Sequence, residues 1–491
     1  MNSSSNSPRG YRAVASRRKH LAACLAAALG LGGLATQAIA ATDTVKVCSD
    51  SDIYHPPLLL LGLRSTVAGA NDGDTIDMTA LSNCTITLTA GEIPITVNNL
   101  LFTGPTSQNV TIDAHKASRI FDHTGTGGVT LSYVSLKNGY SDPPDTPTRV
   151  GFGGCVFSKG SLDLEHSTVS ACEAAYGSAI YAAGNVSLTR SVVTGNNAYR
   201  TDGYPDNLPA TIYLHGTLLA KYSQINSNNG SGIYGRGNIT LDNTTVNGNS
   251  YGGVSAQGYV TLNASIIDSN AGVGINGFGA VTVNGSTISN NKSNFPDGGG
   301  ISVSAKAGTL ATTLTITNST ISGNSVSNQG GGIYAYNTQI KISNSTIAYN
   351  AAAVGGGIYA TSCSNSTIQS SIIADNSVAA GNNQFYSDAH LGLCTLSGSN
   401  NLVGVLSFPL FGALTGPAGL TPLAYHGGAV KTHALLATSP AIGKGNNLLN
   451  LATDERGTGF PRVVGAAIDI GAYERQANDD EIFYNGFQQE P

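Results

Sequence analysis

Three segments of this sequence carry the residues best suited to chemistry, because two of them place aspartates beside arginines and tyrosines and the third adds one aspartate. They follow Asn138, Asn196 and Asn291. Clustered aspartates can bind calcium, and an arginine beside them can serve as the base of an elimination reaction. If the loops lie on one side of the molecule, they predict a cleft lined by Asp142, Asp145, Arg149, Arg200, Asp202 and Asp206, with Asp297 in the third loop. The alternative is a set of solvated loops rich in turn-forming Asp and Pro.

A second candidate site is a column of tyrosines in recurring Gly-x-Ile-Tyr pieces. If the isoleucine of each piece points inward, the next residue points outward on the same strand. The outward column then reads Tyr181, Tyr213, Tyr234, Ser255, Asn276, Ser302, Tyr334 and Tyr359. Stacked tyrosines could hold sugar rings. The three small residues interrupt the column, and the sequence has no tryptophan, so simple packing among the tyrosines is the alternative.

Other chemistries find little support. Between Lys221 and Asp388 the charged residues are few and scattered over different repeats, so no pair of carboxylates recurs at glycosidase spacing. No cysteine spacing indicates a metal, and no G-G-x-G-x-D array indicates calcium-bound repeats. We expect no metal and no cofactor, with calcium reserved for a lyase. The chain has 24 basic and 29 acidic residues without basic clusters, so we expect no nucleic acid partner.

The elements that would position these residues are set by a repeat. A serine or threonine is followed by a β-branched residue two positions later and an asparagine five positions later. Successive asparagines are 21 residues apart three times and 26 apart twice, which indicates stacked units. The motif occurs at Ser191/Val193/Asn196, Ser223/Ile225/Asn228, Thr244/Val246/Asn249, Ser265/Ile267/Asn270, Ser286/Ile288/Asn291, Ser319/Ile321/Asn324, Ser345/Ile347/Asn350 and Ser371/Ile373/Asn376, with Ser167/Val169/Cys172 as a variant.

Alternating apolar residues before each motif, as in Ile239/Leu241 and Val260/Leu262, predict a short strand. With the motif itself and the Gly-x-Ile-Tyr piece, each repeat has three strands and makes one coil. A single coil cannot bury its apolar side, but coils stacked about 4.8 Å apart pair every strand in parallel and close a continuous core. The fold class we predict is all-β, a right-handed parallel β-helix with an N-terminal cap and a C-terminal cap region. The asparagines should form a ladder of amides at one corner, which is a structural role.

The chain divides into five expected segments. Residues 1–40 form a signal peptide, 41–105 an N-terminal cap and first coils, 106–400 the β-helix repeats, 401–475 a C-terminal cap region and 476–491 a short tail. Within the first cap, Leu58 to Ala70 is apolar and free of proline, which favours a helix over the first coil. No segment of the mature chain is apolar enough to cross a membrane.

The signal peptide is indicated by a basic start, an apolar stretch from Leu21 to Leu34, and Ala38-Ile39-Ala40 as a cleavage site before Ala41. Its loss removes five basic residues and leaves 19 against 29 acids, a net charge of about −10. The protein is therefore expected to be secreted or held on the outer surface. Six cysteines in an oxidising compartment indicate three disulfides, of which the simplest pairing is Cys48–Cys84, Cys155–Cys172 and Cys363–Cys394.

Several segments resemble bacterial β-helix proteins of the choice-of-anchor Q type. The N-terminal pieces are Gly62-Leu63-Arg64 and Ala70 through Ile76, and the middle ones are Val110 to Asp113 and Ala117 to Phe121. The more specific C-terminal pieces are Leu420-Thr421-Pro422-Leu423, Gly427-Gly428, Thr432-His433-Ala434-Leu435, Ser439-Pro440-Ala441-Ile442, Ala452-Thr453-Asp454-Glu455-Arg456-Gly457 and Asp469-Ile470-Gly471-Ala472-Tyr473-Glu474. The resemblance implies an exported or surface-attached protein, related in shape to pectate lyases and to polymorphic outer-membrane-type passengers, mostly without known activity.

Two functions follow as hypotheses. The first is a non-catalytic, adhesin-like or envelope-associated protein that binds a polysaccharide or a cell-surface glycan as a monomer. It is motivated by the export signal, the acidity, the sparse charge and the resemblance. The alternative is a polysaccharide lyase or glycoside hydrolase acting in the loop cleft around Asp142 to Asp206. Asp454, Glu455, Arg456, Asp469 and Glu474 are expected to brace the C-terminal region and not to catalyse a reaction.

Overall fold

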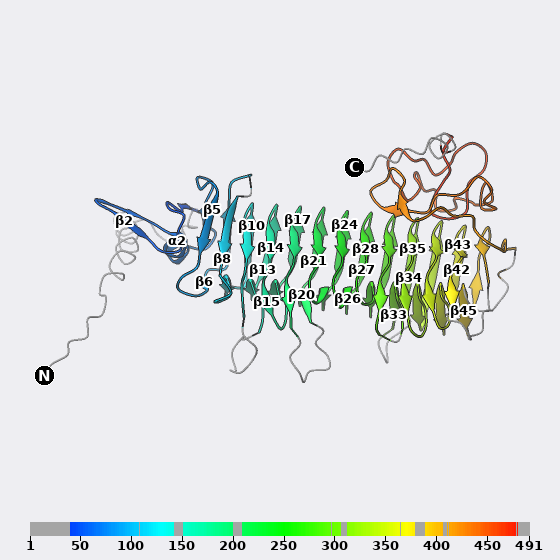
Figure 1. Ribbon diagram of the computed structural model, residues 1–491, viewed down its shortest axis with the longest axis horizontal. Coiled ribbons are helices and arrows are strands. Elements are labelled where there is room, and N and C mark those ends of the chain that lie inside the picture. Colours follow the sequence, from blue (N-terminus) through cyan, green and yellow to red (C-terminus); the bar gives the residue numbers. More distant parts are fainter. Residues whose placement is uncertain are drawn as a thin grey trace, which may run out of the picture.

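The molecule is an elongated rod of stacked coils with a separate lobe packed on one flank (Figure 1). The computed structural model describes residues 40–107, 109–141, 151–199, 209–295, 297–305, 312–363, 365–378, 388–405, 410, 412–477 and 479. The expected signal peptide and most of the expected tail lie outside these residues. The described helices include none with the length and hydropathy of a membrane span.

Three long sheets run the length of the rod. The 14-stranded sheet consists of β1 (Thr42–Thr44), β4 (Thr75–Asp77), β7 (Leu100–Thr103), β10 (Gly128–Ser132), β13 (Ser161–Glu165), β17 (Val186–Thr189), β21 (Leu218–Lys221), β24 (Ile239–Asp242), β27 (Val260–Asn263), β30 (Val281–Asn284), β34 (Thr312–Thr317), β38 (Thr338–Ser343), β42 (Ser366–Gln369) and β46 (Leu396–Ser397). The 13-stranded sheet consists of β5 (Cys84–Thr87), β8 (Val110–Asp113), β11 (Ser135–Lys137), β14 (Thr168–Ser170), β18 (Val192–Thr194), β22 (Gln224–Asn226), β25 (Thr245–Asn247), β28 (Ile266–Asp268), β31 (Thr287–Ser289), β35 (Thr320–Ser322), β39 (Thr346–Ala348), β43 (Ile372–Ala374) and β47 (Leu402–Val403). The 12-stranded sheet consists of β6 (Ile93–Ile95), β9 (Phe121–His123), β12 (Val156–Ser158), β16 (Ile180–Ala182), β20 (Ala210–Leu214), β23 (Ser231–Gly235), β26 (Gly252–Ala256), β29 (Ile275–Gly277), β33 (Ile301–Ser304), β37 (Ile333–Tyr336), β41 (Ile358–Thr361) and β45 (Ala389–Gly392).

Shorter elements fill corners and ends. Two parallel sets of two-residue strands lie at one corner of the coils, and two antiparallel hairpins lie near the ends of the chain. The parallel sets are β15 (Glu173–Ala174) with β19 (Asn197–Ala198), and β32 (Lys292–Ser293), β36 (Ser325–Val326), β40 (Ala351–Ala352) and β44 (Ser377–Val378). The hairpins are β2 (Ile53–His55) with β3 (Leu58–Leu60), and β48 (Ala424–Tyr425) with β49 (Lys431–Thr432), and the described helix is α2 (Leu63–Gly69).

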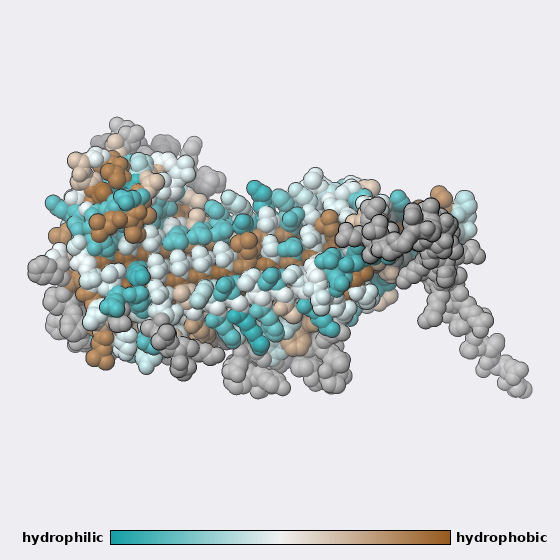
Figure 2. Space-filling model, turned by 180° about the vertical axis from the view of Figure 1, so that it is seen from behind, coloured by the Kyte–Doolittle hydropathy of each residue, from teal (hydrophilic) through white to brown (hydrophobic). Residues whose placement is uncertain are grey.

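All three long sheets pair in parallel and in register, which confirms the predicted coil. Ile239 of β24 pairs with Val260 of β27, and Val260 pairs with Val281 of β30. Along each such strand, buried and partly exposed residues alternate. Because equivalent residues stack, rows of like hydropathy run along the rod (Figure 2). The inward rows form one continuous apolar core.

The predicted asparagine ladder is present at one corner of the coils. The Nδ2 of Asn249 donates to Oδ1 of Asn270 at 2.9 Å, and the Nδ2 of Asn270 donates to Oδ1 of Asn291 at 2.9 Å. Each amide also donates to a carbonyl on the preceding side of the ladder, such as Val246 O at 3.1 Å from Asn270 Nδ2. The series runs from Asn196 to Asn376 and ends on the carboxylate of Asp388. Polar groups that would be costly to bury are thereby paired with one another.

The N-terminal cap differs from its prediction. A helix was expected over Leu58 to Ala70, but only the second half of this segment is helical. That helix is α2, and it buries Leu63, Thr66 and Val67. The first half forms β3, which pairs with β2 in a hairpin that extends beyond the first coil (Figure 1). Pro56 and Pro57 precede Leu58, and a proline pair favours a turn over continued helix.

The three disulfides pair as predicted, Cys48 with Cys84, Cys155 with Cys172 and Cys363 with Cys394. Cys172 occupies the asparagine position of its coil, and its backbone N–H donates to Oδ1 of Asn196 at 2.9 Å. The disulfide and the ladder therefore meet at the same corner. Disulfides of this number indicate an oxidising, extracellular environment.

The C-terminal region packs mainly along the side of the rod and not across its open end (Figure 1). We call residues 415–477 the C-terminal lobe. It lies against the 13-stranded sheet, where Lys431 pairs with Asp268 of β28 at 3.4 Å and Ala472 N donates to Thr346 of β39 at 3.1 Å. Leu420, Leu435 and Ile470 of the lobe share an apolar cluster with Ile372 of β43. From β28 to β43 every residue of this sheet is consequently buried, whereas β14 to β25 keep an exposed face.

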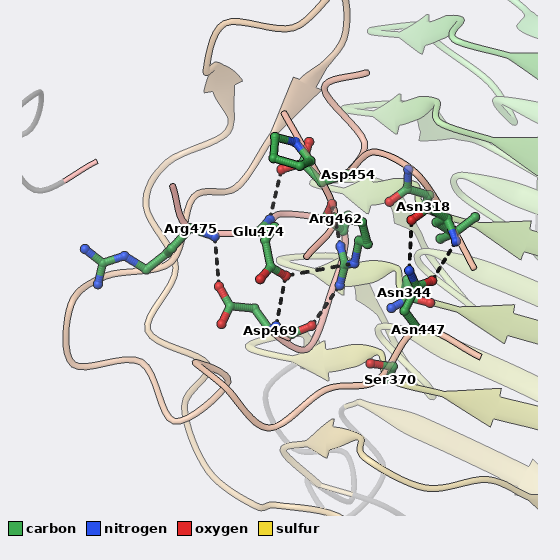
Figure 3. A network of polar contacts seen from close by, with 12 residues as sticks. Asn318, Asn344, Ser370, Asn447, Asp454, Arg462, Asp469, Glu474 and Arg475 are labelled. Carbon is green, nitrogen blue, oxygen red and sulfur yellow. Dashed lines mark hydrogen bonds and ion pairs between the residues drawn. The ribbon is translucent and has the colours of Figure 1, made fainter. Parts of the chain in front are cut away.

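Buried ion pairs hold the lobe together, as expected for its acidic and basic residues (Figure 3). Arg456 donates to Asp454 at 2.7 Å and lies between the rings of Phe460 and Tyr473, 4.0 and 3.8 Å from their centroids. Arg462 is fully buried, 4.0 Å from Glu474.

A single histidine makes the docking of the lobe sensitive to acid. His433 Nε2 lies 2.8 Å from Ser322 Oγ of β35, and its Nδ1 lies 2.7 Å from Thr421 O. Burial lowers the pKa of His433 from 6.5 to about 4. The charge of nearby His426 also lowers this pKa, whereas the hydrogen bond to Thr421 raises it. The folded protein therefore holds His433 neutral, while the unfolded chain binds its proton below about pH 6.5. Neutral His433 therefore contributes to the stability of the folded protein fully above pH 6.5, and this contribution is lost as the pH falls toward 4.

We expect the destabilisation caused by His433→Asn to be smaller at pH 4 than at pH 7, by about 3 kcal/mol. Wild type loses that contribution in acid and the variant does not. Urea unfolding of both proteins at the two pH values gives this double difference. Because burial raises the pKa of Glu474 to about 7, that residue acts in the opposite direction, but it is common to both proteins and cancels. An equal effect of the substitution at both pH values would contradict the assignment.

Candidate functional site

The outer face of the 12-stranded sheet carries one column of residues in register. Tyr181 pairs with Tyr213, and Tyr213 pairs with Tyr234. The column continues through Ser255, Asn276, Ser302, Tyr334, Tyr359 and His390. The structure thus brings the eight positions named from the sequence side by side, and it adds Phe157 before Tyr181 and His390 after Tyr359.

The rings before the interruption form an N-terminal aromatic stack of Phe157, Tyr181, Tyr213 and Tyr234. Adjacent centroids are 5.4, 5.3 and 4.9 Å apart, with interplanar angles of 2°, 11° and 26°. Tyr213 and Tyr234 are only 4% and 7% exposed, because their ring faces pack against neighbouring rings. This part of the column stabilises the sheet and offers a ligand little ring surface.

Polar side chains fix the rim of this stack. His215 Nε2 lies 3.2 Å from the hydroxyl of Tyr181, and Gln257 Nε2 donates to the hydroxyl of Tyr234 at 3.0 Å. Burial raises the pKa of Tyr213, and the Arg236 guanidinium beside it opposes that rise. Tyr213 therefore remains a neutral hydroxyl at physiological pH.

The rings after the interruption form a C-terminal aromatic stack of Tyr334, Tyr359 and His390. Their centroids are 5.8 and 5.0 Å apart, with interplanar angles of 2° and 19°. Tyr359 covers one side of Tyr334, and Ser302 stands on the other side in the column. Because serine is small, Tyr334 keeps ring surface toward the interruption.

A pocket lies where Ser255, Asn276 and Ser302 replace the tyrosines. We call it the gap pocket. Its volume is about 240 Å³, and its lining includes Tyr251 and Phe295 from the coil corners, together with Asp297 and Tyr334. The space exists because three successive coils place a small side chain where their neighbours place a ring. A pocket of this size is smaller than the usual range of about 300–1,000 Å³, so it suits one unit of a longer ligand.

Asp297 is the one carboxylate among the described residues that line the gap pocket. Its Oδ1 accepts from Asn328 Nδ2 at 3.0 Å, and its backbone bridges to Gln329 on the next coil. Burial raises the pKa of Asp297, and the Asn328 hydrogen bond opposes that rise. The same carboxylate contributes to the raised pKa of Tyr334, after burial. The two side chains therefore face one region of the pocket.

Exposed aromatic side chains extend the surface beside the gap pocket. Phe278 directly follows β29 and is 42% exposed, and Tyr336 follows Tyr334 by two residues on β37 and is 49% exposed. A residue two positions further along a strand points to the same face of the sheet. A ligand lying across the coils would meet these rings next to the pocket.

The loop cleft predicted from Asp142, Asp145, Arg149, Arg200, Asp202 and Asp206 lies outside the described residues. Asp297 of the third loop is described, and it lines the gap pocket. In the described part of the chain, no three His, Cys, Asp or Glu side chains come together as a metal site. Tyr251 and Phe295 were missed by sequence reasoning because they belong to turns, where the strand periodicity gives no signal.

Comparison with protein-family models agrees with the architecture. Residues 210–327 match the family model of the right handed beta helix region, which confirms the predicted right-handed parallel β-helix. No curated protein sequence matches the chain. The crystal structure of pectate lyase Pel9A is similar at 15% identity, covering 89% of this chain and 96% of that chain with a TM-score of 0.34. The Dettilon tailspike protein (gp208) is similar at 15% identity, covering 67% of this chain and 64% of that chain with a TM-score of 0.29.

Proposed function

We propose that this protein is a secreted, non-catalytic glycan-binding protein that holds a polysaccharide on the outer face of its 12-stranded sheet. The observation that carries the proposal is the gap pocket, which opens between two aromatic stacks in an otherwise regular column. Sugar units combine apolar ring faces with hydroxyl groups. Tyr334 and Phe295 supply ring surface for the former, and Ser302 and Asn276 supply hydrogen-bonding groups for the latter.

The column geometry favours a ligand that extends along the rod. Four coil steps separate Tyr234 from Tyr334, which at about 4.8 Å per step is about 19 Å along the axis. A pocket that takes one unit, within an open face of that length, suits a polymer. Tyr181, Tyr213 and Tyr234 serve in this account as the packed base of the face, while Tyr334 and Tyr359 lie at the contact.

Binding without cleavage is favoured by the charges of the pocket. Glycoside hydrolysis normally needs two carboxyl groups on opposite sides of the bond. The described lining offers Asp297 alone. No described contact supports the lyase or hydrolase alternative, whose six loop residues lie outside the described part, and calcium belongs to that alternative only.

We further propose that residues 1–40 direct secretion and that the C-terminal lobe is a choice-of-anchor region that holds the protein, as a monomer, at a cell surface. The lobe contains the specific motifs of that resemblance, and they supply its buried contacts. Asp454, Arg456 and Tyr473, for example, form one cluster in its interior.

Filling the gap pocket should abolish binding. In Ser302→Tyr a ring enters the column beside Tyr334 and occupies the pocket, and we expect glycan affinity to fall about tenfold or more. The matched control is Thr315→Tyr, which adds the same ring to the outer face of β34 in the same coil and should leave affinity unchanged. A glycan array with the disulfide-bonded mature chain identifies the ligand, and calorimetry measures the three proteins. Equal affinity for wild type and Ser302→Tyr, or an array without any bound glycan, would contradict the proposal.

The bound polysaccharide should be recovered uncut. Assays for reducing ends and for unsaturated products, with and without calcium, are expected to show no turnover of any glycan that the array identifies. Turnover that survives Ser302→Tyr would place an activity elsewhere on the chain and overturn the non-catalytic assignment.

A further inference from the structure

The gap pocket contains a carboxylate without a cationic partner among the described residues. Asp297 makes no ion pair there, and no described group donates to its Oδ2, while Oδ1 accepts from Asn328. The Oδ2 of this partly buried carboxylate has no described protein partner, so it can accept hydrogen bonds from a ligand, and such bonds are strongest when the donor is charged. The pocket is therefore prepared for a group that donates hydrogen bonds and carries positive charge.

The walls around Asp297 suit such a group. Tyr251, Phe295 and Tyr334 line the same pocket, and Tyr251 and Phe295 are 37% and 44% exposed. Aromatic faces attract cations through their quadrupole, and a cage of rings with a carboxylate is a common way to recognise an ammonium group. Lysine and arginine are missing from the described lining, so nothing there competes for the carboxylate.

We propose that the gap pocket selects glycans that carry a free, protonated amine, such as polymers of deacetylated amino sugars. This inference rests on the proposed glycan-binding function and names the ligand class of the same site. The ammonium group pairs with Asp297 and lies against the rings, while Ser302 and Asn276 meet hydroxyl groups of the sugar. The acidic mature chain, at a net charge of about −10, attracts such a cationic polymer from a distance.

Other ligand classes fit the pocket less well. An acidic sugar would bring a second carboxylate toward Asp297 with no described basic residue to balance it. A calcium ion requires about six to eight oxygen ligands, several of them carboxylates in a typical site. A neutral sugar would leave the charge of Asp297 unpaired. The ammonium group alone satisfies the carboxylate and the rings together.

The test compares two tetrasaccharides that differ only in the amine, β-1,4-linked glucosamine and its fully N-acetylated form. We expect the free amine form to bind the full mature chain about tenfold or more tightly at low salt. Asp297→Asn keeps the shape and the Asn328 contact, and it should reduce affinity for the free amine form to that of the acetylated form. Asp242→Asn on β24 changes the net charge equally, away from the pocket, and should leave both affinities as in wild type.

The outcomes separate this inference from the proposed function. If the acetylated form binds as tightly as the amine, or if Asp297→Asn changes neither affinity, amine selection is wrong. In that case binding blocked by Ser302→Tyr would still support a glycan site. If neither tetrasaccharide binds and the array is empty, both the inference and the proposed function are overturned. Loss of amine binding in Asp297→Asn with retained binding in Asp242→Asn is the result expected.

Discussion

Replacing Asn270 with leucine should destabilise the β-helix by about 4 kcal/mol. The amide makes four side-chain hydrogen bonds, to Asn249 N and Nδ2 at 3.0 and 2.9 Å, to Val246 O at 3.1 Å and to Asn291 Oδ1 at 2.9 Å. Leucine removes all four, and its partners stay buried without replacement, since water cannot reach the corner. Urea unfolding followed by circular dichroism measures the loss.

The matched control is Asn247→Leu on the outer face of β25. The Asn247 side chain makes no hydrogen bond to a described residue, and that face of the sheet is not covered by the lobe. Because Asn247 Oδ1 is buried without a described partner, leucine removes no hydrogen bond there, and we expect no loss of stability beyond about 0.5 kcal/mol. If the two variants lost similar amounts of stability, the hydrogen bonds of the ladder would contribute nothing beyond the effect of replacing any asparagine by leucine.

Replacing Arg462 with methionine should release the C-terminal lobe. Arg462 is fully buried and donates to Asp469 O at 2.7 Å and to Ala472 O at 3.2 Å, with Glu474 at 4.0 Å (Figure 3). Breaking a buried ion pair by removing one partner typically costs about 3–5 kcal/mol, because the other charge stays buried. The lobe should become sensitive to protease while the coils keep their circular dichroism.

The pH dependence of this variant follows from Glu474. Burial already raises its pKa to about 7, and removal of the guanidinium raises it further. A carboxyl group with a raised pKa stabilises the folded state at pH values where it is protonated and loses that contribution as the pH rises. Arg462→Met should therefore be milder at pH 5 than at pH 8. Lys444→Met, which removes an exposed cation of the lobe, serves as control and should leave protease resistance unchanged at both pH values.

Much of the fold was predictable because each coil repeats the same pattern of apolar residues and the same asparagine at one corner. The spacing of Asn249, Asn270 and Asn291 fixes the register, and register then fixes which neighbours face the core and which face solvent. The tyrosine column followed from the same repeat, whereas the disulfide pairs were predicted only as the simplest pairing of neighbouring cysteines.

The position of the C-terminal lobe was not predictable from periodicity. Its traces in the strands are apolar residues on the outer face, namely Ala348, Ala374 and the first residue of the doublets Ile266-Ile267 and Ile372-Ile373. Such a doublet shows that a face is covered without showing by what. Similarly, Leu58 to Ala70 is mostly apolar, and apolarity alone does not distinguish the hairpin strand β3 from the helix α2.

Only part of the gap pocket could be predicted from the sequence. Ser255, Asn276 and Ser302 marked an interruption in the column, which appeared there as a weakness of the tyrosine hypothesis. The structure shows that an interruption of a stack creates space, and that corner residues such as Tyr251 and Phe295 wall it. Corners carry no periodic signal, so their side chains could not be assigned to the site.

The most direct test of the account is hydroxyl radical footprinting of the mature protein with and without its glycan. Oxidation of Tyr251, Phe295 and Tyr334 should fall when ligand is bound, because all three line the gap pocket. Tyr259 and Tyr425, which are 61% and 53% exposed and lie outside the pocket, should react as before. Unchanged oxidation of the three pocket residues, with protection instead in the loops that contain Asp142 and Asp206, would contradict the account.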